Sequence, residues 1–173
     1  MSDTHTHDPI AELTSGLMAA HRRIDAVTAG FEATVLETEP AVGSWSPRDV
    51  VGHLAAWEVE ILDGIEPLLG GPVPRHHPIR HIQSFNTMQA ALRGADPWEV
   101  TAGGLDAVRG RLLARVSQLT PEQLALRGPY PWGEIGTLEG LLRRHIRHMN
   151  EHAEQLEEWR LRRSGVNLRK RPG

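Results

Sequence analysis

Histidine is the residue type whose number and spacing in this chain most clearly suggest chemistry. The sequence holds ten histidines, and His148 and His152 stand four residues apart. On a helix this spacing puts both imidazoles on one face, where they can reach the same ion. His145 precedes His148 by three residues and shares the inward-facing arc, where a buried imidazole needs a partner. A metal ion would provide that partner, and so would carboxylates, carbonyls or water.

A third histidine, His53, falls on a different predicted helix, at the edge of an apolar stripe. With His148 and His152 it would form a three-histidine site that leaves positions on a divalent ion open for water or substrate. Taken alone, His53 could also be a boundary residue with a local hydrogen bond. His21 has no partner at metal-ligand spacing, and we expect it to be solvated or locally bonded.

Candidate catalytic residues flank these histidines. Glu58 and Glu151 could act as a base or support a ligand, although a solvated helix acid is the commoner case. Asn86 could form a hydrogen bond with substrate, or serve only as a local cap or turn residue. His145 could support the metal ligands. Trp57 could form a pocket wall, but an aromatic residue in a bundle stripe usually belongs to the core.

The helices that must position these residues begin at recognisable caps. The side-chain oxygen of Ser46, Asp96 or Thr120 would accept a free backbone N–H, and each is followed by a proline, which loses no hydrogen bond at the first helical position. Apolar residues then repeat every three or four positions. They predict long helices at about residues 9–30, 47–66, 97–119 and 137–163.

The connection between the second and third long helices is long and rich in Gly, Pro and His. Its first part, residues 70–81, should be a loop that controls access to the site, and residues 84–93 should form a short helix. The loop histidines His76, His77 and His81 could line the pocket or take a fourth ligand position, but we expect them to be exposed to solvent.

The predicted fold class is therefore all-α, a four-helix bundle with one long crossover between helices two and three. No alternation of apolar and polar residues is long enough to indicate a strand. We expect one domain at residues 9–163, between a flexible N-terminus at 1–8 and a basic flexible tail at 164–173.

Composition narrows the function classes. The net charge of -3 argues against a protein that coats nucleic acid. The chain has no run of about 18 apolar residues, so we expect no membrane span, and the polar first residues argue for a cytoplasmic protein. With no cysteine, the chain has no thiol nucleophile of its own. The expected partner is a small-molecule substrate, and an exposed apolar stripe would favour a homodimer.

Two segments resemble a known family. Residues 45–58 (WSPRDVVGHLAAWE) are similar to the signature of the second helix in the DinB-like superfamily, and residues 148–156 (HMNEHAEQL) resemble its paired-histidine helix. That superfamily includes YfiT-type metal-dependent hydrolases, bacillithiol and mycothiol transferases, and mycothiol-dependent maleylpyruvate isomerase. The resemblance implies a four-helix bundle whose divalent ion is held by His53, His148 and His152. His145 is additional to that pattern.

The resemblance also implies a function. We expect a metal-dependent transferase or hydrolase that acts on a small electrophile, and one form of this activity would also depend on a thiol. The sequence does not distinguish Zn, Ni, Fe and Mn as the metal. Because the chain lacks cysteine, a low-molecular-weight thiol such as mycothiol would have to arrive as a cosubstrate. Phe85-Asn86 and residues 131–133 (PWG) resemble instead the branch typified by the colibactin self-protection protein, whose members need not keep the histidines. The alternative is therefore a binding or self-protection protein that sequesters or detoxifies a reactive compound without metal catalysis.

The histidines also suggest a pH dependence. An ordinary histidine has a pKa near about 6.5, and only the neutral imidazole binds a metal. From the sequence alone, we expect the stabilisation by metal to shrink between about pH 7.5 and about pH 5.

Overall fold

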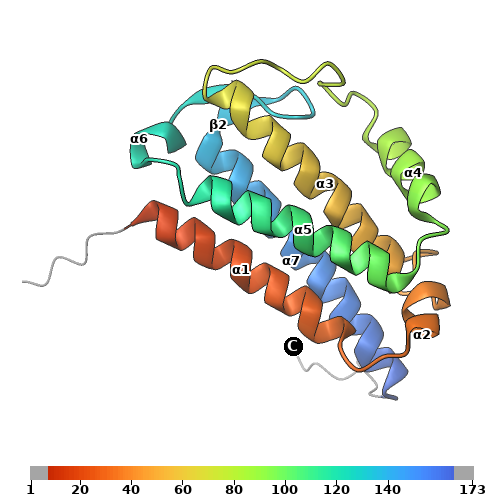
Figure 1. Ribbon diagram of the computed structural model, residues 1–173. Helices are drawn as coiled ribbons and strands as arrows, with labels where there is room; N and C mark the ends of the chain where they lie inside the picture. Colours follow the sequence, from red (N-terminus) through yellow and green to blue (C-terminus); the bar gives the residue numbers. More distant parts are fainter. Residues whose placement is uncertain (1–7, 166–173) are drawn as a thin grey trace, which may run out of the picture.

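Four long helices form the bundle that the sequence predicts. In the computed structural model, which describes residues 8–165, they are α1 (Pro9–Thr28), α3 (Pro47–Leu68), α5 (Trp98–Val116) and α7 (Leu138–Arg163) (Figure 1). α1 packs most extensively against α7, and α3 against α5; α3 also contacts α7, and α1 contacts α5. The order around the bundle is therefore α1, α7, α3, α5, which places α1 and α3 on one diagonal. The flexible termini expected at 1–8 and 164–173 lie almost entirely outside the described residues.

The apolar stripes meet in a core that runs the length of the bundle. One end is built from residues of α1, α3, α5 and α7 around Leu54 and Leu156, which are fully buried. The other end surrounds Leu17, Ile65 and Leu141 and extends to Tyr130. These stripes provide the hydrophobic stabilisation that holds the site-bearing helices α3 and α7 together.

Helix caps fix the first turns of the helices that carry the site. At the start of α3, the Ser46 hydroxyl accepts the Asp49 N–H at 3.2 Å, and Asp49 Oδ2 accepts the Ser46 N–H at 2.9 Å. The cap predicted at Ser46 is confirmed, and the reciprocal bond to Asp49 completes a capping box. Thr137 caps α7 by accepting the Gly140 N–H at 3.0 Å. The cap at Thr120 is also confirmed, and it begins the short helix α6 (Pro121–Leu124).

The cap predicted at Asp96 is wrong. α5 begins at Trp98, and Pro97 occupies the N-cap position. The Trp98 N–H donates instead to Glu37 Oε1 at 2.7 Å. Glu37 belongs to α2 (Ala33–Thr38), a short helix that the sequence reading missed. A carboxylate from another element thus satisfies the free N–H and interacts favourably with the helix dipole.

Helix ends differ by a few residues from those predicted. α3 continues through Pro67 to Leu68: Pro67 donates no hydrogen bond, but the Leu69 N–H still reaches the Ile65 and Glu66 carbonyls and closes the last turn. α5 ends at Val116, three residues before the predicted end. The crossover helix α4 (Ile82–Arg93) begins two residues early and packs against α3.

The expectation that the chain has no strand is wrong. β1 (Arg127–Pro129) and β2 (Ile135–Thr137) form a small antiparallel hairpin in which Gly128 pairs with Gly136. Its turn places Gly133 at a φ of 93°, which glycine adopts without strain. Three-residue strands are too short to show an alternating pattern. The hairpin leads directly into α7 and carries Trp132 towards the site.

No helix within residues 8–165 is both long and apolar enough to cross a bilayer.

Candidate metal centre

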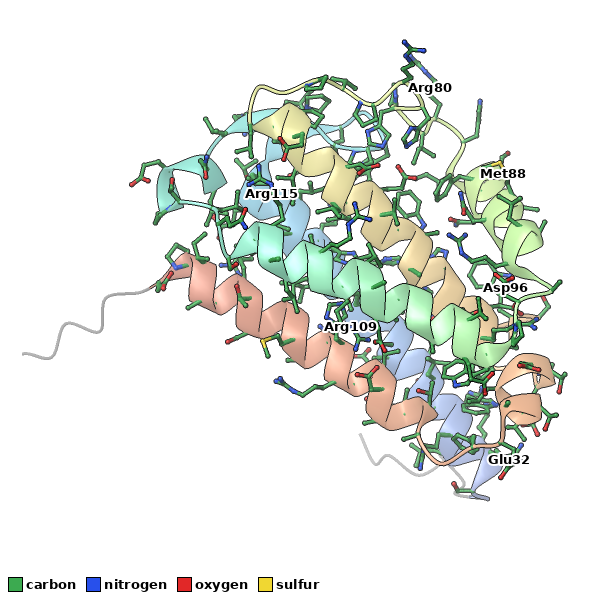
Figure 2. All side chains as sticks on the ribbon, viewed as in Figure 1. Glu32, Arg80, Met88, Asp96, Arg109 and Arg115 are labelled. Atoms are coloured by element: carbon green, nitrogen blue, oxygen red, sulfur yellow. The ribbon has the colours of Figure 1, made fainter. Side chains whose placement is uncertain are left out.

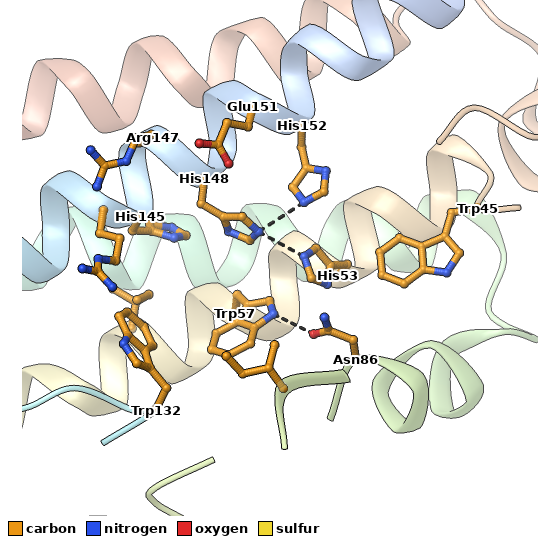
Figure 3. A pocket seen from close by; sticks show the side chains of 13 residues that line it. Trp45, His53, Trp57, Asn86, Trp132, His145, Arg147, His148, Glu151 and His152 are labelled. Carbon is orange, nitrogen blue, oxygen red and sulfur yellow. Dashed lines mark hydrogen bonds between the residues drawn. The ribbon is translucent and has the colours of Figure 1, made fainter. Parts of the chain in front are cut away.

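Three imidazoles converge between α3 and α7. His148 Nε2 lies 3.1 Å from His53 Nε2 and 3.1 Å from His152 Nε2 (Figure 3). All three ligand nitrogens lie within 4.8 Å of one another. The structure therefore brings together the three residues that the sequence singled out. We call them the histidine triad.

The triad holds too few protons to satisfy its nitrogens by hydrogen bonding alone. His152 Nδ1–H donates to Gln155 Oε1 at 2.8 Å, so in the neutral ring the Nε2 of His152 carries a lone pair. That lone pair faces His148 Nε2, whose other neighbour is His53 Nε2. If His148 donates one N–H, it can serve only one of these neighbours well. A cation at the point of convergence would use all the lone pairs at once.

Burial keeps these rings neutral. Desolvation, together with the neighbouring His152, lowers the pKa of His53 to about 3. Desolvation and the nearby His152, His53 and His145 likewise lower the pKa of His148 to about 3. The pKa of His152 is also lowered by burial, although the hydrogen bond to Gln155 and the charge of Glu151 oppose the shift. Neutral imidazole is the form that binds a metal.

The geometry of the donors fits a divalent ion. Two imidazole nitrogens that share one zinc ion at about 2.0–2.1 Å lie no more than about 4.2 Å apart. The two measured separations of 3.1 Å fall inside that limit. Imidazole also suits several borderline transition metals. His53, His148 and His152 are therefore the residues that could hold a metal here.

The triad opens into a cavity of about 600 Å³ whose walls are largely aromatic. Trp45 lies tilted against His53 with ring centroids 5.0 Å apart, and Trp57 lies edge-on to His148 at 6.4 Å. Trp132 of the hairpin closes another side (Figure 3). A pocket of this size and lining suits a small molecule with an apolar body.

Asn86 lies on the α4 side of the same cavity. Its Oδ1 accepts the Trp57 indole N–H at 2.9 Å, a bond that links the crossover helix to α3 (Figure 3). Trp57 is 7% exposed. It therefore serves both as core and as pocket wall, the two roles between which the sequence could not choose. Asn86 lines the cavity, as a substrate-binding residue must.

Glu58 occupies a different place from the one expected for a solvated helix acid. It is 0% exposed, and Oε1 lies 2.6 Å from His21 Nε2 and 3.5 Å from His145 Nε2. Burial alone would raise the pKa of Glu58, but the hydrogen bonds from His145 and His21 outweigh it and lower the pKa. Glu58 does not line the cavity, whereas His145 does. The three residues form a polar cluster across the bundle diagonal.

His21 is therefore a correction to the sequence analysis. It is buried, and its partner is Glu58 of α3, the helix diagonally opposite α1 in the bundle. The two residues are 37 positions apart in the sequence. The expectation of solvent exposure for the loop histidines is also only partly met. His76 and His81 are exposed, but the His77 side chain is 4% exposed and binds Glu60.

Sequence reasoning missed several residues of the cavity. Gln155 orients His152, and its only signal is that it follows His152 by three positions on one helix. Arg147 lies exposed at the rim, and within residues 8–165 it has no ion pair or hydrogen bond. Trp45 precedes the cap of α3 and Trp132 lies in the hairpin, so both are outside the periodic stripes; both fall in segments that carry the family resemblance, which did not place them at the cavity.

Comparisons with known proteins agree with this architecture. YfiT from Bacillus subtilis, described as a probable metal-dependent hydrolase with an unusual four-helix bundle topology, superposes with a TM-score of 0.73 at 20% identity. The alignment covers 96% of this chain and 94% of YfiT. An uncharacterised protein from Clostridium difficile 630 gives a TM-score of 0.74 at 10% identity, covering 90% of this chain and 97% of that one. No curated protein sequence matches significantly.

Identities this low establish a shared fold and leave function open. The sequence itself carries the stronger evidence, because the family model described as the DinB superfamily matches residues 17–156, a span that includes the whole histidine triad. This chain therefore belongs to the DinB superfamily.

Proposed function

We propose that this protein binds one divalent metal ion through the histidine triad and uses it in a transferase or hydrolase reaction on a small electrophilic molecule. The observation that carries the proposal is the convergence of three neutral Nε2 atoms at the base of an aromatic cavity. Membership of the DinB superfamily supports it, as does the description of YfiT as a probable metal-dependent hydrolase.

An ion held by three imidazoles would act as a Lewis acid and would lower the pKa of a water or thiol that it binds. The chain contributes the surroundings. The rings of Trp45, Trp57 and Trp132 line the cavity, and a substrate packed against them would exclude water. Water exclusion strengthens every electrostatic interaction inside the site.

Two polar side chains are placed to orient a substrate. Asn86 is held by Trp57, and its amide nitrogen remains available to donate a hydrogen bond. Arg147 provides a cation at the rim that has no partner in the described part of the chain. A substrate with an apolar body and an anionic group would match both features.

Thiol-dependent transfer is the form of the reaction that we test first. The sequence has no cysteine, so the thiol must be a cosubstrate, and an S-transfer reaction would join its sulfur to the electrophile as the leaving group departs. Hydrolysis is the simpler form, in which water takes the place of the thiol.

The experiment uses protein loaded separately with zinc, nickel, manganese and iron. Turnover of 1-chloro-2,4-dinitrobenzene with mycothiol tests transfer, and turnover of 4-nitrophenyl acetate tests hydrolysis. We expect activity that requires metal and that is lost in His148→Ala. His81→Ala, an exposed histidine outside the cavity, is the matched control and should be as active as the wild type.

Equal turnover by His148→Ala and the wild type would contradict the proposal. Stoichiometric binding of the electrophile without turnover, unchanged in His148→Ala, would instead identify a protein that sequesters reactive compounds without metal.

A further inference from the structure

A second group of metal-ligating side chains lies outside the histidine triad. Glu60 of α3 receives two imidazoles from the crossover loop: His76 Nε2 and His77 Nε2 each lie 2.8 Å from the same oxygen, Oε2. The three ligand atoms lie within 4.8 Å of one another. Glu60 and His77 have side chains only 8% and 4% exposed, whereas His76 is 53% exposed.

A tight turn makes this arrangement. Successive residues of an extended segment point to opposite sides, so neighbouring histidines would not normally reach one oxygen. Here the His77 N–H donates to the Pro74 carbonyl at 3.0 Å, which closes a turn. The two imidazole rings then lie 4.5 Å apart, edge to face, on the same side of the loop.

The cluster has the chemistry of a cation site. A buried carboxylate is costly without compensating partners, and here both partners are themselves metal ligands. Two histidines and one glutamate are a known set of zinc ligands that leaves a position open. The exposed edge at His76 provides a path for the ion to enter from solvent.

We propose that Glu60, His76 and His77 bind a second divalent cation of the zinc class, and that this ion fastens the crossover loop to α3. The site shares no ligand with the histidine triad. Glu60 lies seven residues after His53 on the same helix, which is about 10 Å along its axis. The inference therefore stands whether or not the triad is catalytic.

Fastening the loop here would fix one wall of the aromatic cavity. Ile79, two residues after His77, is buried against Trp57 and Phe85. The Ile79 N–H donates to the Pro131 carbonyl at 2.7 Å, next to Trp132 of the hairpin. An ion bound to Glu60 would therefore hold in place the loop segment around Ile79, which packs against Trp57.

Zinc stoichiometry tests the proposal directly. The variant His53→Ala/His148→Ala/His152→Ala removes the triad, and after zinc loading and dialysis it should retain one equivalent of zinc. Adding His76→Ala/His77→Ala should remove that equivalent. Glu60→Gln, which keeps the shape of the side chain, should weaken the remaining zinc site by at least the roughly 10–100-fold that loss of an outer partner costs. His81→Ala, from the same loop, is the matched control and should change nothing.

Protease sensitivity of the loop gives a second readout. Arg75 and Arg80 flank the two histidines, and both are exposed; Figure 2 shows Arg80 on the outside of the loop. Zinc should slow tryptic cleavage after these arginines in the triad-deleted variant and should not do so once His76 and His77 are replaced.

Two results would overturn the proposal. One is a triad-deleted variant that is folded, as judged by its helical circular dichroism, and holds no zinc. The other is zinc that persists after His76→Ala/His77→Ala is added. If the triad-deleted variant does not fold, the comparison moves to the wild type, where His76→Ala/His77→Ala should lower the zinc content from two equivalents to one. An unchanged content would then contradict the second site.

Discussion

At the scale of single residues, the orientation of His152 depends on Gln155. The amide oxygen of Gln155 accepts the His152 Nδ1–H, which leaves the Nε2 lone pair facing the other two histidines. Gln155→Ala removes that constraint, and we expect metal affinity to fall by roughly 10-fold, the lower end of the range for such partners, because Gln155 is exposed. Isothermal titration with zinc measures the change. Gln118→Ala, at an exposed glutamine after α5, should leave affinity unaltered.

Glu58 should matter for stability rather than for the reaction. It joins His21 and His145 in the centre of the bundle, and removing one partner of a buried charged group leaves the others unsatisfied. We expect Glu58→Ala to lower the free energy of unfolding by about 3–5 kcal/mol. Glu58→Gln, which keeps a hydrogen-bond acceptor, should cost less. Urea denaturation at neutral pH measures both, and a loss within error for Glu58→Ala would show that the cluster stabilises nothing.

The same glutamate gives the bundle an acid sensitivity. The pKa of Glu58 is lowered in the folded state, so the unfolded chain binds the proton first. Its contribution to stability is present above the unfolded pKa of about 4.5 and is lost as pH falls through the lower, folded value.

These residues also mark what the sequence could and could not reveal. The spacing of His148 and His152 on one helix is readable directly, and the resemblance to a family supported His53, for which the residues alone left two roles open. The contact between His21 and Glu58 could not be predicted from the sequence, because it depends on α1 and α3 lying diagonally opposite each other in the bundle. Spacing along one helix carries no information about that pairing.

At the scale of elements, α3 is packed tightly against the hairpin at Gly64. A Cβ added there would lie 2.9 Å from Pro131 Cγ, whereas one added at Gly110 of α5 would meet nothing within 4 Å. We expect Gly64→Ala to destabilise the protein by about 1–3 kcal/mol through overpacking. Gly110→Ala, at an exposed helix position, should stabilise it by about 0.5–1 kcal/mol. Thermal unfolding of the two variants checks the opposite signs.

Gly64→Ala should also change the shape of the cavity. Pro131 precedes Trp132, so displacing the hairpin shifts one aromatic wall. A Gly64→Ala variant as stable as the wild type, or more stable, would show that the hairpin does not pack against α3 in this way.

The long helices were predictable, and the short elements were not, for a physical reason. Stripes such as that of α7 extend over many turns, so their period is clear, and the box at Ser46 marks where α3 begins. α2 and the two strands span too few residues to show any period. The cap that Glu37 provides for α5 was hidden for a different reason, since it comes from 61 positions away.

At the scale of the whole molecule, the buried triad makes stability depend on pH. The pKa values of His53 and His148 are lowered to about 3 in the folded state, against about 6.5 when unfolded. Below about pH 6.5 the unfolded chain therefore binds protons that the folded chain does not, and stability falls by about 1.4 kcal/mol per pH unit for each histidine. Urea denaturation of chelator-treated protein should show this slope, and His53→Ala/His148→Ala should show a shallower one.

The same pKa values revise the expected effect of metal. Because His53 and His148 stay neutral without an ion, protons compete with metal at these two rings only as the pH approaches about 3. The difference in melting temperature between metal-loaded and chelated protein should therefore persist from about pH 7.5 to about pH 5. The sequence alone predicted that this difference would close over that range. A difference that vanishes by about pH 5 would mean that the rings protonate at ordinary pH values.

Metal analysis of two variants tests the central claim, that the histidine triad holds a divalent ion. His76→Ala/His77→Ala provides a background from which zinc bound by the crossover loop has been removed. After loading and dialysis, this variant should contain one equivalent of zinc. Adding His148→Ala, which removes the ring that contacts both other histidines, should reduce the content to zero while the helical circular dichroism stays unchanged. Equal zinc in the two folded variants, or none in the first, would contradict the account.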